Sequence, residues 1–164
     1  MPEKSTKAYS NKQEKMIQDY LGWKRVSASG ARPFHPGDVR SDEWLSECKT
    51  HTKIVHRIDI VKKVWNKISI EATSSFKRPI LFVDNGSQNK NHTWCIFQER
   101  FADFSKVKRV HDYVTYFDSY TKISFDHEYM QSVIGDDECT TILISGKSLL
   151  LMRLTTFKSM LELE

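Results

Sequence analysis

Residues 37–49, GDVRSDEWLSECK, contain the local pattern that most restricts how this chain can fold. Two short runs, 38–40 and 44–49, flank the polar segment SDEW and predict a β-hairpin. If SDEW is a four-residue turn, the numbers of paired residues sum to 85, so that Arg40 faces Leu45 and Asp38 faces Glu47. Opposed residues in such a pair have Cβ atoms about 4.5 to 5.5 Å apart. The hairpin therefore predicts two carboxylates close together on one face.

Two carboxylates held this close repel each other and require a shared proton or a cation. Their oxygens are ligands of hard cations, so Mg²⁺ or Mn²⁺ is the expected ion. Alternate side chains of a strand lie on one face, so Lys49 is expected to point the same way as Glu47. A lysine there can stabilise charge that develops on a phosphate. The alternative interpretation is a surface hairpin whose charges pair across the strands.

The remaining pattern predicts alternating helices and strands. Apolar spacing favours a helix from about Asn11 to Leu21, capped by Ser10 or Asn11 and ended by Gly22. A second amphipathic helix is expected within 57–72. Further elements are strands at 78–86 and 92–101, a short helix and turn at 125–137, two strands around Ser145-Gly146, and a closing helix at 155–163. This order predicts an α/β (α+β) fold with a central mixed β-sheet flanked by helices.

The length of 164 residues favours one domain over 1–164, with a core at about 11–100, an extension at 103–139 and closing elements at 140–164. No apolar run approaches the roughly 20 residues of a membrane span, so no membrane association is expected. The N-terminus lacks the apolar core of a secretory signal. Three widely spaced cysteines argue against a disulfide framework and a CxxC-type zinc site. These features predict an intracellular protein.

Charge is distributed unevenly along the chain. Residues 1–78 hold 16 Lys/Arg and 9 Asp/Glu, a net charge of +7, whereas residues 79–164 hold 9 and 12, a net charge of −3. A basic half is typical of proteins that bind a polyanion such as nucleic acid. The alternative interpretation is a solvated, lysine-rich surface.

Two more features accompany the hairpin. Glu14 shares the apolar side of the first predicted helix with Ile17 and Leu21, where a carboxylate requires a partner. The alternative is that Glu14 completes a cap begun by Asn11. The basic loop KRVSASGARPFHPGD directly precedes Asp38 and offers serine hydroxyls and glycine amides to phosphates, unless it is an ordinary flexible loop.

The string Glu14 … LGWKRVSASGARPFHPGDV … WLSECK resembles the PD-(D/E)XK nuclease superfamily. Within it, the chain is most similar to the archaeal-type Holliday-junction resolvases, which some viruses also carry. Members have a glutamate on the first helix, then an arginine, a serine-glycine loop, an aspartate and an E-x-K strand. The likeness covers roughly residues 11–85.

The resemblance implies a restriction-endonuclease-like core and a Mg²⁺-dependent endonuclease that cuts branched DNA and leaves a 5′-phosphate. Its catalytic residues would be Lys49, Glu14, Asp38 and Glu47. Its metal ligands would be Asp38, Glu47, Glu14 and the backbone carbonyl of Cys48. Its DNA contacts would come from Arg25, Ser27, Ser29, Lys24 and Arg32. The family implies a homodimer that acts in DNA recombination or repair, in the cytoplasm of a prokaryotic cell or a virus-infected host.

The chain departs from the family pattern in three places. The proline of Pro36-Gly37-Asp38 stands one residue early, the hairpin between Asp38 and Glu47 is tight, and residues 103–139 have no recognisable counterpart. The last departure leaves substrate choice open, because junction recognition depends on dimer geometry and on loops outside the site.

Two other functions remain compatible with the sequence. One is a different nuclease of the same superfamily, acting on duplex, flap or single-stranded DNA. The other is a non-catalytic nucleic-acid-binding module whose carboxylates form salt bridges. A second metal site built from His111, Asp112, His127 and Glu128 is conceivable, but the aromatic spacing around it favours packing. Trp94, Tyr116 and Tyr120 are compatible with base stacking, although core packing is the favoured interpretation.

Overall fold

The structure is a computed structural model that describes residues 5–26, 37–110 and 115–162. Its α-helices are α1 (Thr6–Leu21), α2 (Lys62–Ser74), α3 (His127–Val133) and α4 (Leu154–Leu161), and two short 3₁₀ helices cover Lys90–His92 and Glu99–Phe101. Its strands are β1 (Lys24–Arg25), β2 (Val39–Arg40), β3 (Trp44–Lys49), β4 (Arg57–Val61), β5 (Arg78–Asp84), β6 (Thr93–Gln98), β7 (Lys108–Arg109), β8 (Phe117–Asp118), β9 (Lys122–Asp126), β10 (Glu138–Ile144) and β11 (Lys147–Arg153).

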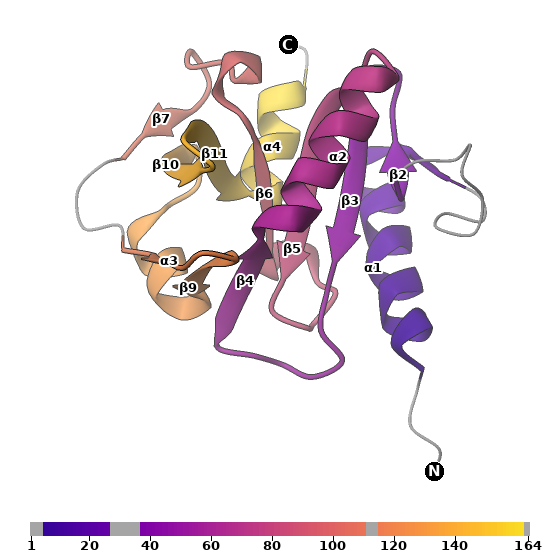
Figure 1. Cartoon of the computed structure of the whole chain (residues 1–164), viewed down its shortest axis with the longest axis horizontal. Helices are drawn as coiled ribbons and strands as arrows, with labels where there is room; N and C mark the ends of the chain where they lie inside the picture. Colours follow the sequence, from indigo (N-terminus) through magenta and orange to yellow (C-terminus); the bar gives the residue numbers. More distant parts are fainter. Residues whose placement is uncertain (1–4, 27–36, 111–114, 163–164) are drawn as a thin grey trace.

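Within the described residues, eight strands form a large mixed sheet in the order β1-β2-β3-β5-β6-β11-β10-β7 (Figure 1). The pairs β3–β5 and β10–β7 are parallel, and the other pairs are antiparallel. Helices flank this sheet, which confirms the predicted mixed α/β architecture. The sequence did not predict that β4, β9 and β8 would form a separate three-stranded sheet.

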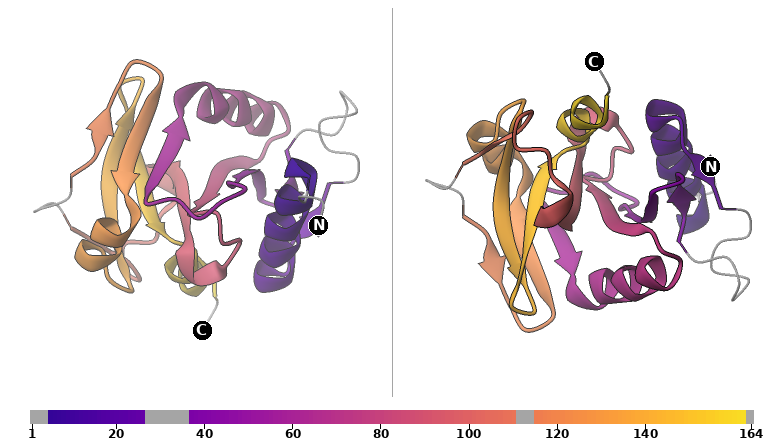
Figure 2. Two further views of the ribbon diagram at one scale, coloured as in Figure 1. Left: turned by 90° about the horizontal axis from the view of Figure 1, so that it is seen from below. Right: turned by 90° about the horizontal axis from the view of Figure 1, so that it is seen from above.

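Two apolar clusters cover the two faces of the large sheet. Strand β5 contributes to both, because Leu81 and Val83 face one cluster while Ile80 and Phe82 face the other. The first cluster joins the sheet to α2, α3 and the three-stranded sheet, and the second joins it to α1 and α4. Figure 2 shows α1 and the orange β9 region at opposite ends of the molecule. None of the described helices combines the length and apolar composition that a membrane span requires.

Helix α1 begins earlier than the sequence predicted. Its N-cap is Ser5, whose hydroxyl accepts a hydrogen bond from the Ala8 amide, so the predicted caps Ser10 and Asn11 were wrong. The prediction overlooked that Ser5 offers the same capping chemistry one and a half turns upstream. The predicted end is confirmed, because Gly22 adopts the left-handed conformation at the C-cap. Glu14 consequently lies in the middle of the helix, which rules out its role in an Asn11 cap.

The segment 57–72 is not one helix. Residues Arg57–Val61 form β4 and only Lys62–Ser74 form α2. The strand shows period-two burial, since Ile58 and Ile60 are buried while Arg57 and Val61 are exposed. The helical prediction was wrong for 57–61 because Ile58 and Val61 also fit a helical spacing, and only pairing with β9 selects the extended form.

The predicted hairpin is confirmed where β2 and β3 pair. Val39 lies opposite Ser46 and Arg40 lies opposite Leu45, as the predicted register requires. The Ser41 amide donates to the Trp44 carbonyl and closes the turn. The predicted strands around 78–86 and 92–101, the two strands around Ser145-Gly146, and the helices within 125–137 and 155–163 are also confirmed.

Candidate active site at the open edge of β3

The candidate site lies where β3 extends beyond its short neighbour β2. Strand β2 has two residues and β3 has six, so the C-terminal half of β3 has no described strand beside it on that edge. The Cys48 amide points to this edge and donates a hydrogen bond of 2.8 Å to Oδ2 of Asp38. The N–H and C=O of one strand residue point to the same side, so the Cys48 carbonyl also faces the edge.

Asp38 is held by its backbone as well as by its carboxylate. Its amide donates to the Ser46 carbonyl at 2.8 Å, and its carbonyl accepts from the Val26 amide at 2.9 Å. The β2–β3 ladder ends at Val39 and Ser46, and the Asp38 amide bonds to the Ser46 carbonyl, so the predicted pairing of Asp38 directly opposite Glu47 was wrong. The two carboxylates are nevertheless close enough to interact, because burial raises the pKa of Glu47 and the charge of Asp38 raises it further.

Helix α1 presents a third carboxylate to the same edge. Gln13, Glu14 and Ile17 are its buried residues. Oε2 of Glu14 accepts from Nε of Arg25 at 2.9 Å and lies 2.8 Å from Nη2 of the same guanidinium. Nε2 of Gln13 donates to the Lys49 carbonyl at 2.7 Å. The helix is thereby connected to both β1 and the end of β3.

Lys49 supplies a cation at the end of β3. Its Nζ lies 3.2 Å from Oε1 of Glu47, as expected for two residues on one face of a strand. Its side chain is 53% exposed while that of Glu47 is 12% exposed, so the ammonium faces solvent where a substrate would arrive. Lys67 of α2 also lies near enough to lower the pKa of Glu47 by its charge.

The electrostatics of the site favour added positive charge. Burial raises the pKa of Glu14, the Asp38 charge raises it further, and Arg25 offsets part of this increase. Burial and the Asp38 charge also raise the pKa of Glu47, against the opposing effect of Lys49. Burial raises the pKa of the Cys48 thiol well above its ordinary value, so the thiol is a structural group rather than an ionised ligand.

The donor set suits a hard divalent cation. Among residues 5–26, 37–110 and 115–162, no group of three or more His, Cys, Asp and Glu side chains is arranged to hold a metal. The edge instead offers the carboxylates of Asp38 and Glu47 together with the Cys48 carbonyl. Mg²⁺ is typically bound by one or two carboxylates with waters completing its coordination, so the residues fit this ion.

The sequence-predicted residues are therefore mostly gathered in one place. The structure brings Glu14, Arg25, Asp38, Glu47 and Lys49 together at one edge. Lys24 is exposed on β1, opposite Arg40. Ser27, Ser29 and Arg32, as well as His111 and Asp112, lie outside the described residues.

Sequence reasoning missed the roles of three site residues. Gln13 donates a hydrogen bond to the last residue of β3, and Arg25 donates one to Glu14. The charge of Lys67 on α2 lowers the pKa of Glu47. A signal existed for Gln13, since a polar residue beside Glu14 on the buried side of a helix needs a partner. Lys67 gave no signal, because only the packing of α2 against β3 brings it near.

The aromatic residues named from the sequence separate into two groups. Trp94 is buried and Tyr116 packs against the core, as expected. Tyr120 is 97% exposed, so the expectation that it packs in the core was wrong. Tyr120 is exposed because it lies in the turn between β8 and β9. In this hairpin the core contact is made by Ile123 of β9.

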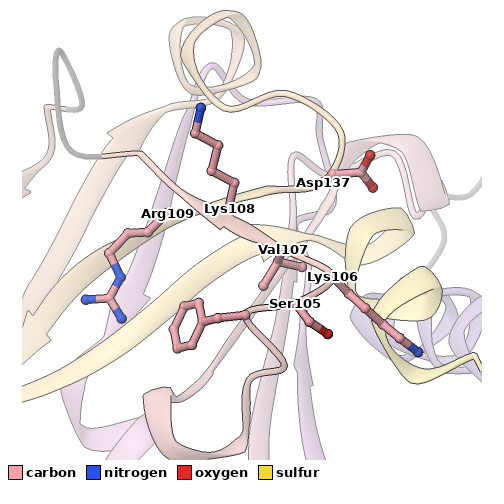
Figure 3. A pocket seen from close by; sticks show the side chains of 7 residues that line it. Ser105, Lys106, Val107, Lys108, Arg109 and Asp137 are labelled. Carbon is pink, nitrogen blue, oxygen red and sulfur yellow. The ribbon is translucent and has the colours of Figure 1, made fainter.

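A second basic feature lies at the opposite edge of the large sheet. Residues from Phe104 to Arg109 and Asp137 line a cavity of about 370 Å³ beside β7 (Figure 3). Lys106 donates to the carbonyls of Met160 and Glu162, and Arg109 pairs with Glu99. Lys106 and Arg109 therefore already have partners within the protein, and Asp137 is the acidic residue among those that line the cavity. This cavity lacks the clustered carboxylates of the β3 edge.

Comparisons with known proteins found no relative from which the role of the site could be inferred. No family model matches the chain, and neither a curated protein nor a solved structure matches it.

Proposed function

We propose that the protein is a metal-dependent endonuclease that hydrolyses phosphodiester bonds of DNA, in the manner of a PD-(D/E)XK enzyme. The observation that carries the proposal is the convergence of Glu14, Asp38, Glu47 and Lys49 on the open edge of β3. Burial and the charge of Asp38 raise the pKa of Glu14 and Glu47 there, so this cluster of carboxylates is costly to keep without a cation. Such sites are where function is concentrated.

The order of elements supports the same proposal. The succession is α1, β1, β2, β3, β4, α2, β5. In the sheet the E-x-K strand β3 lies between its antiparallel hairpin partner β2 and the parallel strand β5, which follows α2. We propose that this part is the restriction-endonuclease-like core that the resemblance implies. Residues 103–139, which the resemblance does not cover, contribute β7, β8, β9 and α3 around it.

Each residue has a distinct chemical task in the proposed reaction. Asp38, Glu47 and the Cys48 carbonyl would hold Mg²⁺, or Mn²⁺ in its place. The bound ion supplies an activated water and neutralises charge on the phosphate. Lys49 would stabilise the negative charge that develops as the water attacks, and would leave its ion pair with Glu47 to do so. Glu14, restrained by Arg25, would orient the water or a second ion.

The proposed substrate is branched DNA, with a Holliday junction as the first candidate. The basic N-terminal half would bind the phosphate backbone, with Lys24, Arg25, Ser27, Ser29 and Arg32 nearest to the cut. A homodimer would pair two such sites for two cuts. The proposed setting is intracellular DNA recombination or repair. Because phosphate contacts release counterions, affinity should fall steeply as salt increases.

A panel of DNA substrates tests the proposal. The protein is incubated with a four-way junction, a flap, a linear duplex and a single strand, each with and without Mg²⁺. We expect Mg²⁺-dependent cleavage with junction preference, and a loss of about 100- to 1,000-fold in rate for Lys49→Ala. Lys147→Ala, which removes an exposed cation on β11, three strands away from β3 in the sheet, is the matched control and should retain activity. Preference for another substrate would indicate a different nuclease of the superfamily, and no cleavage of any substrate would refute the proposal.

A further inference from the structure

The hairpin between β8 and β9 exposes two aromatic side chains to solvent. Phe117 is 62% exposed and Tyr120 is 97% exposed. Phe117 lies opposite Ser124, on the face of the three-stranded sheet turned away from the core residues Ile123 and Phe125. Burying an aromatic ring is favourable, so two rings left in water on one hairpin indicate a surface that is covered in use.

This hairpin is fixed against the start of α2. The Lys62 amide donates to the Thr121 carbonyl at 3.0 Å, and Nζ of Lys62 pairs with Asp118 at 2.6 Å. Val61 lies opposite Lys122 in the β4–β9 ladder. The aromatic turn therefore has a defined position relative to α2.

The surface continues from the hairpin to the candidate active site. Lys49 and Val61 both line one cavity of about 210 Å³. Val64 and the buried Leu81 and Val83 supply much of its apolar lining. Lys49 thus belongs both to the proposed catalytic edge and to this cavity, while Val61 belongs both to the cavity and to the sheet that carries Phe117.

Cations accompany this path. Lys62 pairs with Asp118, Lys122 pairs with Asp59 at 3.1 Å while remaining 46% exposed, and Lys67 lies 3.8 Å from Glu71 while remaining 64% exposed. Lysines near exposed rings are a combination that single-stranded nucleic acid uses, because its phosphates can replace the carboxylates as partners of the lysines while the bases stack on the rings.

We propose that the path from Lys49 across the Val61 cavity to Phe117 and Tyr120 binds unpaired nucleotides of the DNA substrate. The inference rests on the proposed function and specifies its substrate as DNA with a single-stranded segment next to the cut. The bases of that segment stack on Phe117 and Tyr120, and its backbone follows the lysines. Residues 103–139, through β8 and β9, thereby select the substrate.

Binding to labelled DNA tests the inference without requiring cleavage. The full chain is titrated, in metal-free buffer, with a forked duplex that carries 2-aminopurine in its single-stranded arm, and with the matching duplex. Stacking on a ring quenches this fluorophore. We expect the double variant Phe117→Ala, Tyr120→Ala to lose the quenching and to bind the fork about 30-fold more weakly, the loss of two base–aromatic contacts. Its affinity for the duplex should not change.

Phe76→Ala provides a matched control. Phe76 is 98% exposed, but it follows the C-terminus of α2, whose 13 residues separate it from Lys62 by about 20 Å. This variant should bind the fork as the wild type does. Tyr120→Phe keeps a ring and should retain the quenching. Because the substituted side chains are exposed, thermal melting should be unchanged in all four proteins.

The outcomes distinguish this inference from the proposed function. Mg²⁺-dependent cleavage by the wild type, with unchanged fork binding in the double variant, would overturn the inference and leave the nuclease intact. Selective loss of fork binding in the double variant, with no cleavage by the wild type, would support the binding surface and overturn the nuclease. If the double variant instead abolishes self-association and leaves DNA binding unchanged, the aromatic surface is a dimer contact and the inference is wrong.

Discussion

Two buried groups of titratable side chains differ in how their charges are satisfied. At the β3 edge, burial and the charge of Asp38 raise the pKa of Glu14 and of Glu47, and Arg25 and Lys49 offset this only in part. Between β6 and α3, His127 is buried beside His92 and Trp94. Its ring forms a hydrogen bond with each of these two residues and packs edge-on against both rings.

The histidine group has a defined proton arrangement. An indole N–H can only donate, so Nδ1 of His127 accepts the 3.0 Å hydrogen bond from Nε1 of Trp94. Nε2 of His127 then carries the proton and donates to Nδ1 of His92 at 3.0 Å. Burial lowers the pKa of His127 to about 4, with contributions from His92 and Arg153. Neutral His127 is therefore part of the packing.

The comparison separates a structural group from a candidate site. His127 finds a hydrogen-bond partner for each of its ring nitrogens inside the protein. At the open strand edge, burial and the charge of Asp38 raise the pKa of Glu14 and Glu47 despite the nearby cations, so a bound cation would lower the energy of their ionised forms. Burial alone thus does not mark function, but a cluster of buried carboxylates does.

The largest effect is expected from removing the centre of the histidine group. His127→Ala leaves a cavity and removes the partners of Trp94 and His92, so the free energy of unfolding should fall by about 3 kcal/mol. Urea denaturation followed by tryptophan fluorescence measures this change. His92→Ala, at a half-buried position, should cost less. Equal stability of the His127 variant and the wild type would show that the group is not structural.

The two groups should respond to pH in opposite directions. Native His127, with a pKa of about 4 against an ordinary 6.5, binds fewer protons than the unfolded chain between these values, so it adds up to about 3 kcal/mol of stability as pH rises through this window. Glu47 has a raised pKa, so the native state binds more protons above pH 4.5 and loses stability as pH rises.

Denaturation of single variants across this pH range, without metal, separates the two contributions. The stability of Glu47→Gln relative to the wild type should increase with rising pH, and that of His127→Gln should decrease. Parallel pH profiles for the two variants would contradict the assigned pKa directions.

The smallest effect is expected from neutralising Asp38. Asp38→Asn keeps an oxygen for the Cys48 amide and removes the charge that raises the pKa of Glu14 and Glu47. The melting temperature of the metal-free protein should rise by about 2–4 °C, and Mg²⁺ should stabilise the wild type but not the variant. Differential scanning fluorimetry measures both.

Asp59→Asn is the control of opposite sign for this experiment. Burial raises the pKa of Asp59, but hydrogen bonds from Ser124 and Lys122 outweigh it and lower the pKa. Neutralising this carboxylate should therefore lower the melting temperature. A decrease for Asp38→Asn as well would mean that the β3 edge is a balanced salt-bridge cluster with no need of a cation.

Sequence reasoning reached the hairpin and its neighbours because their determinants are local. The polar turn SDEW fixes the register of Val39 with Ser46, and the two-residue period places Glu47 and Lys49 on one face. It failed at Arg57–Val61, where apolar spacing fits both helix and strand, and at Tyr120, which lies in the turn of the β8–β9 hairpin, a hairpin that was not predicted from the sequence. It also gave no sign of the histidine group, whose members come from separate elements.

The sequence by itself determined which residues carry charge, where the E-x-K strand turns, and that helices and strands alternate into a mixed sheet. Only the tertiary structure decided that β2 stops short of Cys48, that α1 brings Glu14 and Gln13 to that gap, and that the β8–β9 hairpin docks on α2. The physical reason is range: turn geometry and strand alternation act between neighbours in the chain, whereas burial, like-charge repulsion and the end of a ladder depend on packing between distant segments.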